Sequence, residues 1–329
     1  MYNNTCPLCN SPAKKINDYL FNVDYDSHYL GNPSILNCNK CNLSFVDEQP
    51  EISKLDYYYT NIYRAKGRPH FIKPDSIIEP AARHYLSLIN ILPRLLNLFD
   101  EPVLNSQPIK ILEVGAGWGE TGKILNSIHP GKFEIYTIEP CRDVQNSLNS
   151  AGYYLIESVE ALEDESIDAV ISLHVLEHFA NPNDFVNLFD SKLKRSGYLH
   201  LEVPNCRFHE GFENRPYDSP HLTFWNSESL REFGSRYNYE VITIFTTGAT
   251  LAEDFTAMNN WREKYYNWNP TNVNTISFKS SLKSIIKKIT SRLGFTLSRY
   301  SKNILNQDLC CFAEDDPNHW VISVCFEKK

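Results

Sequence analysis

Residues 109–119, IKILEVGAGWG, constrain the possible folds of this chain more than any other segment. The first six positions are mostly apolar, as is typical of a short buried strand. Three alternating glycines follow, Gly115, Gly117 and Gly119, and the next residues, ETGKILNSI, have the pattern of a helix. Glycines let the backbone approach a ligand closely, and a helix N-terminus offers free N–H groups. The segment therefore predicts a ligand-binding turn at the carboxyl end of a strand.

The glycines alone leave several ligand classes open. Gly117 to Lys123 has the spacing of a phosphate-binding P-loop, although Ile124 stands where a Ser or Thr should hold magnesium. Gly117, Gly119 and Gly122 also fit the dinucleotide fingerprint. A tight turn that binds nothing is a further interpretation. Residues later in the chain must decide among them.

Three later segments give that information. KFEIYTIEP places Glu139 twenty residues after Gly119, where a carboxylate can accept hydrogen bonds from both hydroxyls of a ribose. YYLIES reads as a third strand that ends at Glu157 and Ser158. A fourth strand at 169–173 is followed by the string His174 to His178.

The frame Glu113-x-Gly115-x-Gly117-x-Gly119 and these three segments resemble, in the same order, the motifs of class I S-adenosylmethionine (SAM) methyltransferases. The resemblance covers residues 109–246. It implies an α/β fold with a Rossmann-like sheet of seven strands, the last antiparallel, and it implies SAM as the ligand. Glu113 would suit the cationic ligand, Ser158 would contact the adenine, and His174 would touch SAM or shape its pocket. The implied SAM-binding residues are Glu113, Gly115, Ala116, Gly117, Gly119, Glu139, Ser158 and His174.

The rest of this domain, residues 106–329, follows the same pattern. GYLHLEVP reads as strand five, NSESLREFGSRY as a helix capped by Asn226, YEVITIFTTG as strand six and NHWVISVCFEKK as strand seven. Residues 251–316 then form a helical insertion or lid between strands six and seven. Within it, residues 278–295 have one apolar and one basic face, which allows peripheral membrane contact, an anionic substrate, or packing on the core.

Four cysteines give a second strong signal. Cys6 and Cys9 form one CxxC pair, Cys38 and Cys41 form another, and 28 residues separate the pairs. Four thiolates at this spacing can close a tetrahedral Zn²⁺ site with no open position, so the predicted role is structural. Residues 1–47 are therefore predicted to be a zinc ribbon, with an extended hairpin between the pairs. A segment this short and polar has too little hydrophobic core to fold alone. Metal binding is therefore expected to supply much of its stability.

Composition limits the remaining possibilities. The chain has 329 residues and a formal charge of -8, which disfavours broad binding to nucleic-acid phosphates. No apolar run approaches the ~20 residues that span a bilayer. The start of the chain, MYNNTCPLCN, has no signal-peptide pattern. The prediction is a cytoplasmic enzyme whose cysteines stay reduced; nothing in the sequence gives its oligomeric state.

Residues 48–105 connect the ribbon to the main domain. They contain a tyrosine-rich stretch, KLDYYYTNIYRAKGRPH, and then a helical pattern with Tyr85, Leu88, Ile89 and Leu92 at helical spacing.

Methyl transfer to a hydroxyl needs a base, and histidine suits this role near neutral pH. His221, in YDSPHLTFWN after strand five, is the first candidate, and His178, beside Glu177, is the second. Two other interpretations concern the same string. An acid-x-x-Glu-His string holds a divalent ion in some O-methyltransferases, but His174 replaces the first acid here. The spelling HxxEH also matches inverted zinc peptidases, which need both histidines on one helix.

The order of ribbon, tyrosine segment and SAM domain resembles methyltransferases of bacterial sugar and surface-glycan biosynthesis. Their deoxysugar C-methyltransferases carry a Glu-His pair after strand five, whereas this chain has Pro220 and His221 there. Their catalytic tyrosines correspond to Tyr57, Tyr58 or Tyr59. The predicted reaction is methylation of a hydroxyl of a sugar, nucleotide-sugar or glycan intermediate. An RNA methyltransferase, a sugar C-methyltransferase and a scaffold without turnover are the alternatives.

Overall fold

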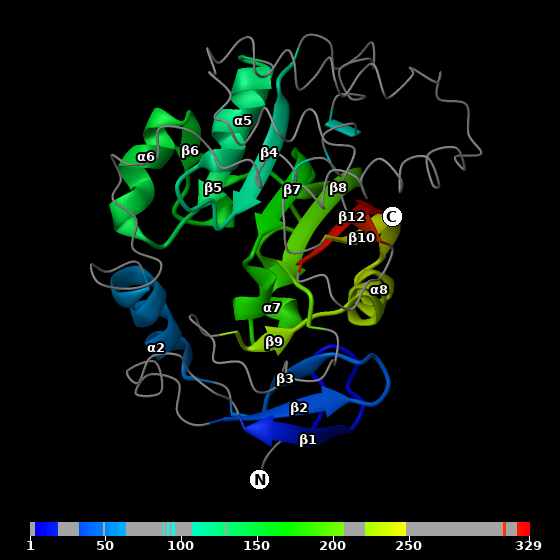
Figure 1. The fold of residues 1–329 in the computed structure, drawn as a ribbon. Coiled ribbons are helices and arrows are strands. Elements are labelled where there is room, and N and C mark those ends of the chain that lie inside the picture. The colour runs from blue at the N-terminus through cyan, green and yellow to red at the C-terminus, as the bar shows by residue number, and fades with distance from the viewer. Residues whose placement is uncertain are drawn as a thin grey trace, which may run out of the picture.

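The computed structural model describes residues 4–18, 33–48, 50–63, 88, 91, 94–95, 107–128, 130–206, 221–247, 312–313 and 321–329. These residues form one large mixed sheet and one small antiparallel sheet, which lie next to each other (Figure 1).

The large sheet has the strand order β11-β10-β12-β8-β7-β4-β5-β6. Its strands are β4 (Ile109–Val114), β5 (Phe133–Ile138), β6 (Tyr153–Leu155), β7 (Ile167–Leu173), β8 (Leu193–Pro204), β10 (Tyr239–Thr247), β11 (Phe312–Ala313) and β12 (Val321–Lys328). Neighbours from β6 to β8 are parallel, and β12 runs antiparallel to both β8 and β10. The predicted seven-stranded fold with an antiparallel last strand is confirmed. Strand β8 begins four residues earlier than GYLHLEVP suggested, at Leu193 rather than Gly197.

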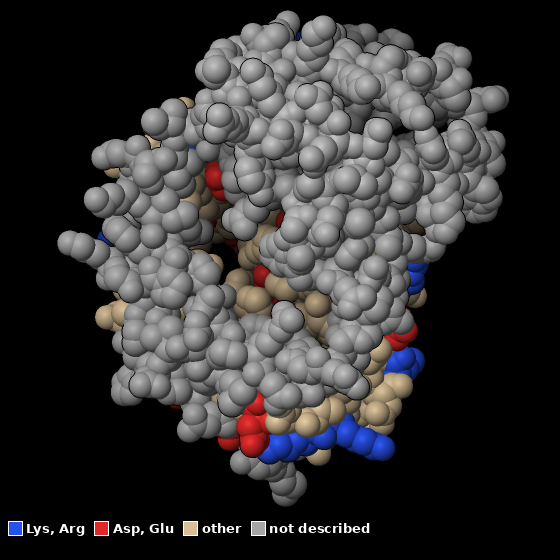
Figure 2. All heavy atoms as spheres, viewed as in Figure 1, with Lys and Arg blue, Asp and Glu red and all other residues tan. Residues whose placement is uncertain are grey.

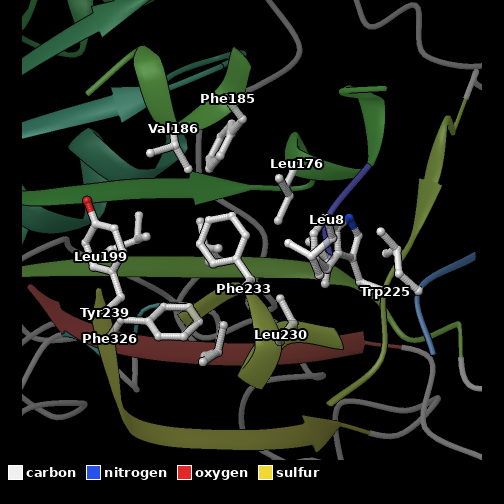
Figure 3. Packing of buried hydrophobic residues seen from close by; sticks show 14 of the residues in the cluster. Leu8, Leu176, Phe185, Val186, Leu199, Trp225, Leu230, Phe233, Tyr239 and Phe326 are labelled. Carbon is white, nitrogen blue, oxygen red and sulfur yellow. The ribbon is translucent and has the colours of Figure 1, made fainter. Parts of the chain in front are cut away.

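Helices cover both faces of this sheet, because alternate residues of each strand point to opposite sides. On one face, Ile111 packs in a cluster with side chains of α5 (Glu120–Ile128) and α6 (Gln145–Ser150). On the other face, its neighbour Leu112 packs in a cluster with side chains of α7 (Pro182–Asn187) and α8 (Ser227–Arg236). Figure 3 shows the second cluster, in which Phe185 and Val186 of α7 and Phe233 of α8 pack against the strands.

The helix predicted after strand five is confirmed together with its cap. The Asn226 side chain accepts a hydrogen bond from Ser229 N at 2.8 Å, and Ser229 Oγ accepts one from Asn226 N at 2.9 Å. This reciprocal pair satisfies two N–H groups at the helix start. It therefore fixes where α8 begins, six residues after His221.

Most of the predicted insertion, 251–311 and 314–316, lies outside the described residues, including 278–295. The two described residues within it form β11 rather than a helix, and they extend the sheet beside the end of β10. In the connector, Leu88, Ile91 and Leu95 are buried against the α5 face. Tyr85, Ile89 and Leu92 lie outside the described part. Among the helices that the structure describes, none has the length and apolar character needed to cross a membrane.

The small sheet, here called the ribbon sheet, has the order β1-β2-β3-β9. Its strands are β1 (Ala13–Asp18), β2 (Ser34–Cys38), β3 (Ser44–Val46) and β9 (Thr223–Phe224). Strands β1 and β2 form the predicted antiparallel hairpin, although residues 19–32 between them are not described. The fourth strand comes from the main domain, which the sequence did not reveal. It joins the ribbon to the segment that follows His221.

The tyrosine-rich stretch forms α2 (Ile52–Tyr57) and continues into a π-helical turn at Tyr58–Ile62. In Figure 1, α2 lies on the side of the large sheet where β4 ends, next to the ribbon sheet. The turn thereby places tyrosines near the carboxyl ends of the parallel strands, where ligands bind in open α/β sheets.

Candidate active site

The glycine turn after β4 has a backbone that requires glycine. Gly115, Gly117 and Gly119 have φ angles of 72°, 55° and 74°, in the left-handed region that side chains disfavour. A Cβ on Gly115 would also lie 2.6 Å from a methyl carbon of Val175. Ala116, within the turn, is buried. The turn thus needs glycine for its left-handed backbone and for its packing against Val175.

Glu139 begins the loop after β5 and holds the glycine turn from the side. Its Oε2 accepts a hydrogen bond from Gly117 N at 2.8 Å, and its Oε1 accepts one from Cys141 N at 2.9 Å. A carboxylate has about four lone-pair sites, so each oxygen can accept one more hydrogen bond. This arrangement fits two ribose hydroxyls.

Glu113 lies near the end of β4 in the protein interior. It is buried and accepts a hydrogen bond from the Tyr153 hydroxyl, which in turn accepts one from Gly122 N at 2.7 Å. Burial raises the pKa of Glu113 to about 7, although hydrogen bonds from Tyr153 and Thr121 oppose that shift. Glu113 therefore connects β4 to α5 and β6. Tyr153 was not predicted, because an aromatic residue at the start of a strand carries no functional pattern.

Ser158 lies at the carboxyl end of β6 and is exposed. Its hydroxyl donates to the carboxylate of Glu160 and accepts from Glu160 N at 3.3 Å, which caps a short 3-10 turn at Val159–Ala161. It stands on the same sheet edge as Glu139, one strand further along.

His174 follows β7 directly with a φ of 56°, which turns its side chain back over the strand ends. Its Nε2 lies 3.1 Å from Glu202 Oε1 of β8, and its Nδ1 lies 3.6 Å from Glu177 Oε1. Burial alone would lower the pKa of His174, but the hydrogen bonds and charges of Glu177 and Glu202 raise it to about 10. His174 is therefore a cation at neutral pH, which makes it unsuitable as a base. Glu202 was missed, although an acid in the apolar pattern of strand five was a signal.

The two histidines singled out as bases meet at one carboxylate. Ligand atoms of Glu177, His178 and His221 all lie within 4.8 Å of one another, and the two imidazole centres are 5.1 Å apart. Burial alone would raise the pKa of Glu177, but a hydrogen bond from His174 and nearby histidine charge lower it to about 2. Glu177 is thus ionised, and its buried Oε2 has no hydrogen-bond partner among the described residues. The same three side chains can hold a divalent ion, and His174 is not among them.

Tyr59 of the π-helical turn and Tyr63, directly after that turn, complete this cluster. The rings of Tyr59 and Tyr63 lie 5.4 Å and 6.3 Å from the His178 ring, edge to face. Tyr58 is buried, whereas Tyr57 is 52% exposed. Of the three tyrosines considered from sequence, Tyr59 alone makes this contact, and Tyr63 was missed. Figure 2 shows a hollow on this view of the molecule in which acidic and uncharged side chains are visible.

The four cysteines of the ribbon come together as predicted. All four Sγ atoms lie within 4.8 Å of one another, with 3.6 Å from Cys6 to Cys41 and 3.4 Å from Cys9 to Cys38. These separations exclude disulfides at ~2.05 Å and are close to the ~3.8 Å between sulfurs of a tetrahedral site with 2.3 Å zinc–sulfur bonds. The donor set therefore fits Zn²⁺.

One protein family and two solved structures resemble this chain. The methyltransferase-domain family matches residues 82–244. Phosphoethanolamine N-methyltransferase 2 of Haemonchus contortus is a structural neighbour with 12% identity and a TM-score of 0.43, over 96% of this chain and 68% of that chain. A SAM-dependent methyltransferase from Archaeoglobus fulgidus has 17% identity and a TM-score of 0.39, over 72% of this chain and 93% of that chain. No curated protein matches the chain.

The fold and the family match together define a class I SAM-dependent methyltransferase domain. Residues 82–244, just under half of the chain, therefore belong to a SAM-dependent methyltransferase domain.

Proposed function

We propose that this methyltransferase transfers a methyl group to a hydroxyl of a sugar, nucleotide-sugar or related glycan intermediate, with a histidine as general base. The observation that carries the proposal is the placement of His221 and His178 against the ionised Glu177, at the sheet edge that also carries the glycine turn. A carboxylate beside an imidazole holds the ring in one orientation and stabilises the imidazolium that forms.

On the donor side, the glycine turn with Ala116 and the Glu139 carboxylate bind the amino-acid and ribose ends of SAM. Ser158 contacts the adenine, and His174 with its two glutamates shapes the floor of the pocket. Bound SAM supplies a methyl group that its sulfonium already activates. Glu113 acts indirectly, because its carboxylate is committed to Tyr153.

On the acceptor side, His221 takes the proton of the acceptor hydroxyl as the oxygen–methyl bond forms and the methyl–sulfur bond breaks. The electron pair of the broken bond stays on sulfur, so the charges balance. Glu177 stabilises the resulting His221 cation, and His178 fixes the position of Glu177. The enzyme must also bring the oxygen in line with the methyl group at near-attack distance.

The side chains around His221 support the proposed acceptor class. Tyr59 and Tyr63 offer aromatic rings on which the apolar face of a sugar can lie, as far as the described residues go. The Glu177 carboxylate can also accept a hydrogen bond from a neutral hydroxyl of a sugar. The order of ribbon, tyrosine segment and SAM domain in the sequence agrees with this acceptor class.

The ribbon is proposed to hold a structural Zn²⁺ through Cys6, Cys9, Cys38 and Cys41, in a cytoplasmic, reducing environment. Cys38→Ser should release the metal and unfold the ribbon, because closed thiolate sites supply folding energy. Zinc content per chain and thermal unfolding measure this directly. A Cys141→Ser variant, at a buried cysteine outside the cluster, is the matched control. Full metal content in Cys38→Ser would refute the assignment.

The function is tested by a screen with methyl-labelled SAM against nucleotide sugars, surface glycans and RNA. The expected result is label on a sugar oxygen, with no transfer by His221→Ala. Transfer to RNA with binding that weakens steeply with salt would favour the RNA alternative instead. A SAM-binding protein that labels none of the three classes would support a scaffold.

A second candidate, methylation of a sugar carbon, gains from one observation. This chain lacks the glutamate that precedes the histidine in the C-methyltransferases, but the structure places Glu177 beside His221. A His–Glu pair could also remove a proton from a carbon beside a carbonyl. Solvent deuterium exchange at that carbon of a keto-sugar, in the absence of SAM, would identify this reaction. No exchange, together with oxygen labelling, supports the first proposal.

A further inference from the structure

Resting on the proposed function, we infer that the ribbon is a positioning element of the acceptor site: its metal-closed fold holds His221 against Glu177, so metal occupancy controls methyl transfer but not SAM binding. Four sets of contacts lead from the cysteines to His221.

The residues directly after His221 belong to the ribbon sheet. Thr223 and Phe224 pair with Phe45 and Ser44 of β3, and Val46 N donates to Leu222 O at 3.0 Å. His221 thus lies two residues before a strand that the ribbon holds in place. A two-residue strand has little stability without its partner.

The other side of the same strand is bonded to the turn that carries Glu177. Leu222 N donates to Glu177 O at 2.8 Å, and Thr223 Oγ1 donates to Phe179 O at 3.1 Å. Strand β9 therefore lies between the ribbon and the Glu177–His178 turn. If β9 shifts, the position of His221 relative to Glu177 changes.

The second CxxC pair is coupled to the helix after β9. Asn42 follows Cys41 with a φ of 60°, and its carbonyl accepts a hydrogen bond from Asn226 Nδ2 at 2.7 Å. The Asn42 side chain donates to Glu228 Oε2 at 3.1 Å. Asn226 thus caps α8 with one side-chain atom and binds the metal-site loop with the other.

Apolar contacts continue this connection. Leu8, between the first two cysteines, is fully buried in the same cluster as Trp225 and Leu230, and Figure 3 shows it beside Trp225. The metal site shares its apolar surroundings with the main domain and presents that face to the protein interior. This packing favours a positioning role over a ribbon that binds nucleic acid with its exposed face.

The first test removes zinc in graded steps from the full chain with a chelator. The expected result is SAM affinity within twofold of the starting value, while turnover with the sugar acceptor found in the screen falls at least tenfold. Imidazole NMR provides a readout independent of the acceptor: the His221 signal, identified by its loss in His221→Gln, should shift and return when zinc is restored. Unchanged turnover and signal, or parallel loss of SAM binding, would overturn the inference. If the screen finds no acceptor, the proposed function fails, but the NMR signal of His221 and the SAM affinity still decide whether the ribbon positions His221.

The second test uses Asn226→Asp, which keeps the oxygen that caps α8 but cannot donate to Asn42 O. Since small misplacements of catalytic groups cost up to ~100-fold in rate, kcat should fall about 10- to 100-fold. Zinc content, acceptor KM and SAM affinity should stay within threefold. The double variant Asn226→Asp with Glu228→Gln controls for charge repulsion. If the double variant recovers full turnover, repulsion is the cause and the inference is wrong.

Discussion

The two halves of the candidate site are built differently. The donor half consists of backbone turns at the ends of adjacent strands β4, β5 and β6, with the glycine turn and Glu139 bonded to each other within one layer of the fold. The acceptor half joins side chains from three distant segments: the π-helical turn, the turn after β7 and the segment before β9. The first is fixed by local backbone geometry, whereas the second depends on tertiary packing. The two halves should therefore respond differently to mutation.

The largest expected effect separates the halves. His221→Ala should lower kcat by about 10²- to 10⁴-fold, the usual contribution of a general base, because the acceptor proton loses its destination. SAM affinity, measured by calorimetry, should stay within about twofold. The substitution removes a group that acts on the acceptor in the transition state and leaves the residues of the donor half unchanged.

Tyr59→Ala removes the ring beside His178 and should also reduce kcat/KM for the sugar, whereas Tyr57→Ala, at an exposed tyrosine outside the cluster, is the matched control. Equal losses of SAM affinity and kcat in His221→Ala would show that the halves are one unit.

The same difference explains what could be predicted from sequence. The seven-stranded sheet with its antiparallel last strand followed from the resemblance to class I methyltransferases, and the ribose role of Glu139 stays a prediction. The strands along the chain, the cap at Asn226 and the two CxxC pairs follow from local patterns: periodicity, capping chemistry and CxxC spacing. Each is determined within about ten residues, or by residue types that have few alternative uses.

The rest could not be predicted, for physical reasons. Tyr63, Glu202 and the pairing of His221 with Glu177 depend on which segments pack together, and no short-range pattern encodes that. Strand β9 was missed because two residues are too few to show an alternating pattern. The contact between Tyr153 and Glu113 was also missed, because the sequence position of Glu113 does not reveal which side chain reaches it from β6.

In the donor half, the buried Glu113 should make the stability of the fold depend on pH. The pKa of Glu113 is about 7 in the folded protein and 4.5 as its ordinary value. The folded state binds this proton more tightly, so the group stabilises the fold fully below pH 4.5, and that contribution is lost as pH rises to about 7. When the pH rises from 5 to 8, the unfolding free energy of the unaltered protein should therefore fall by ~2.5 kcal/mol more than that of Glu113→Gln, which lacks this carboxyl group.

Urea unfolding at both pH values measures this difference. Glu157→Gln, at an exposed carboxylate on the same sheet edge, should behave like the unaltered protein. Parallel pH dependence in Glu113→Gln and the unaltered protein would contradict the assignment.

A smaller effect is expected where the donor half meets the ribose. Glu139→Ala should weaken SAM binding by about 1 to 3 kcal/mol, because hydroxyls and the Gly117 and Cys141 amides lose their acceptor. Calorimetric titration with SAM measures the loss, and Glu134→Ala, at the other end of β5, is the control. Unchanged affinity would remove Glu139 from the ribose role, and a matching fall in kcat at saturating SAM would link it to the acceptor half.

The smallest expected effect tests the far end of the donor half. Ser158→Ala removes one hydrogen bond, so SAM affinity should fall by about 0.5 to 1.5 kcal/mol if the hydroxyl contacts the adenine. Its role as cap of the Val159–Ala161 turn predicts a loss of unfolding free energy of similar size, about 0.5 to 1 kcal/mol. Affinities for SAM and for free methionine separate the two roles, because only SAM carries the adenine. Ser166→Ala, which also removes a hydroxyl from an exposed turn, serves as the control. A stability loss with unchanged SAM affinity would make Ser158 a structural cap, and the donor half would then end at the ribose.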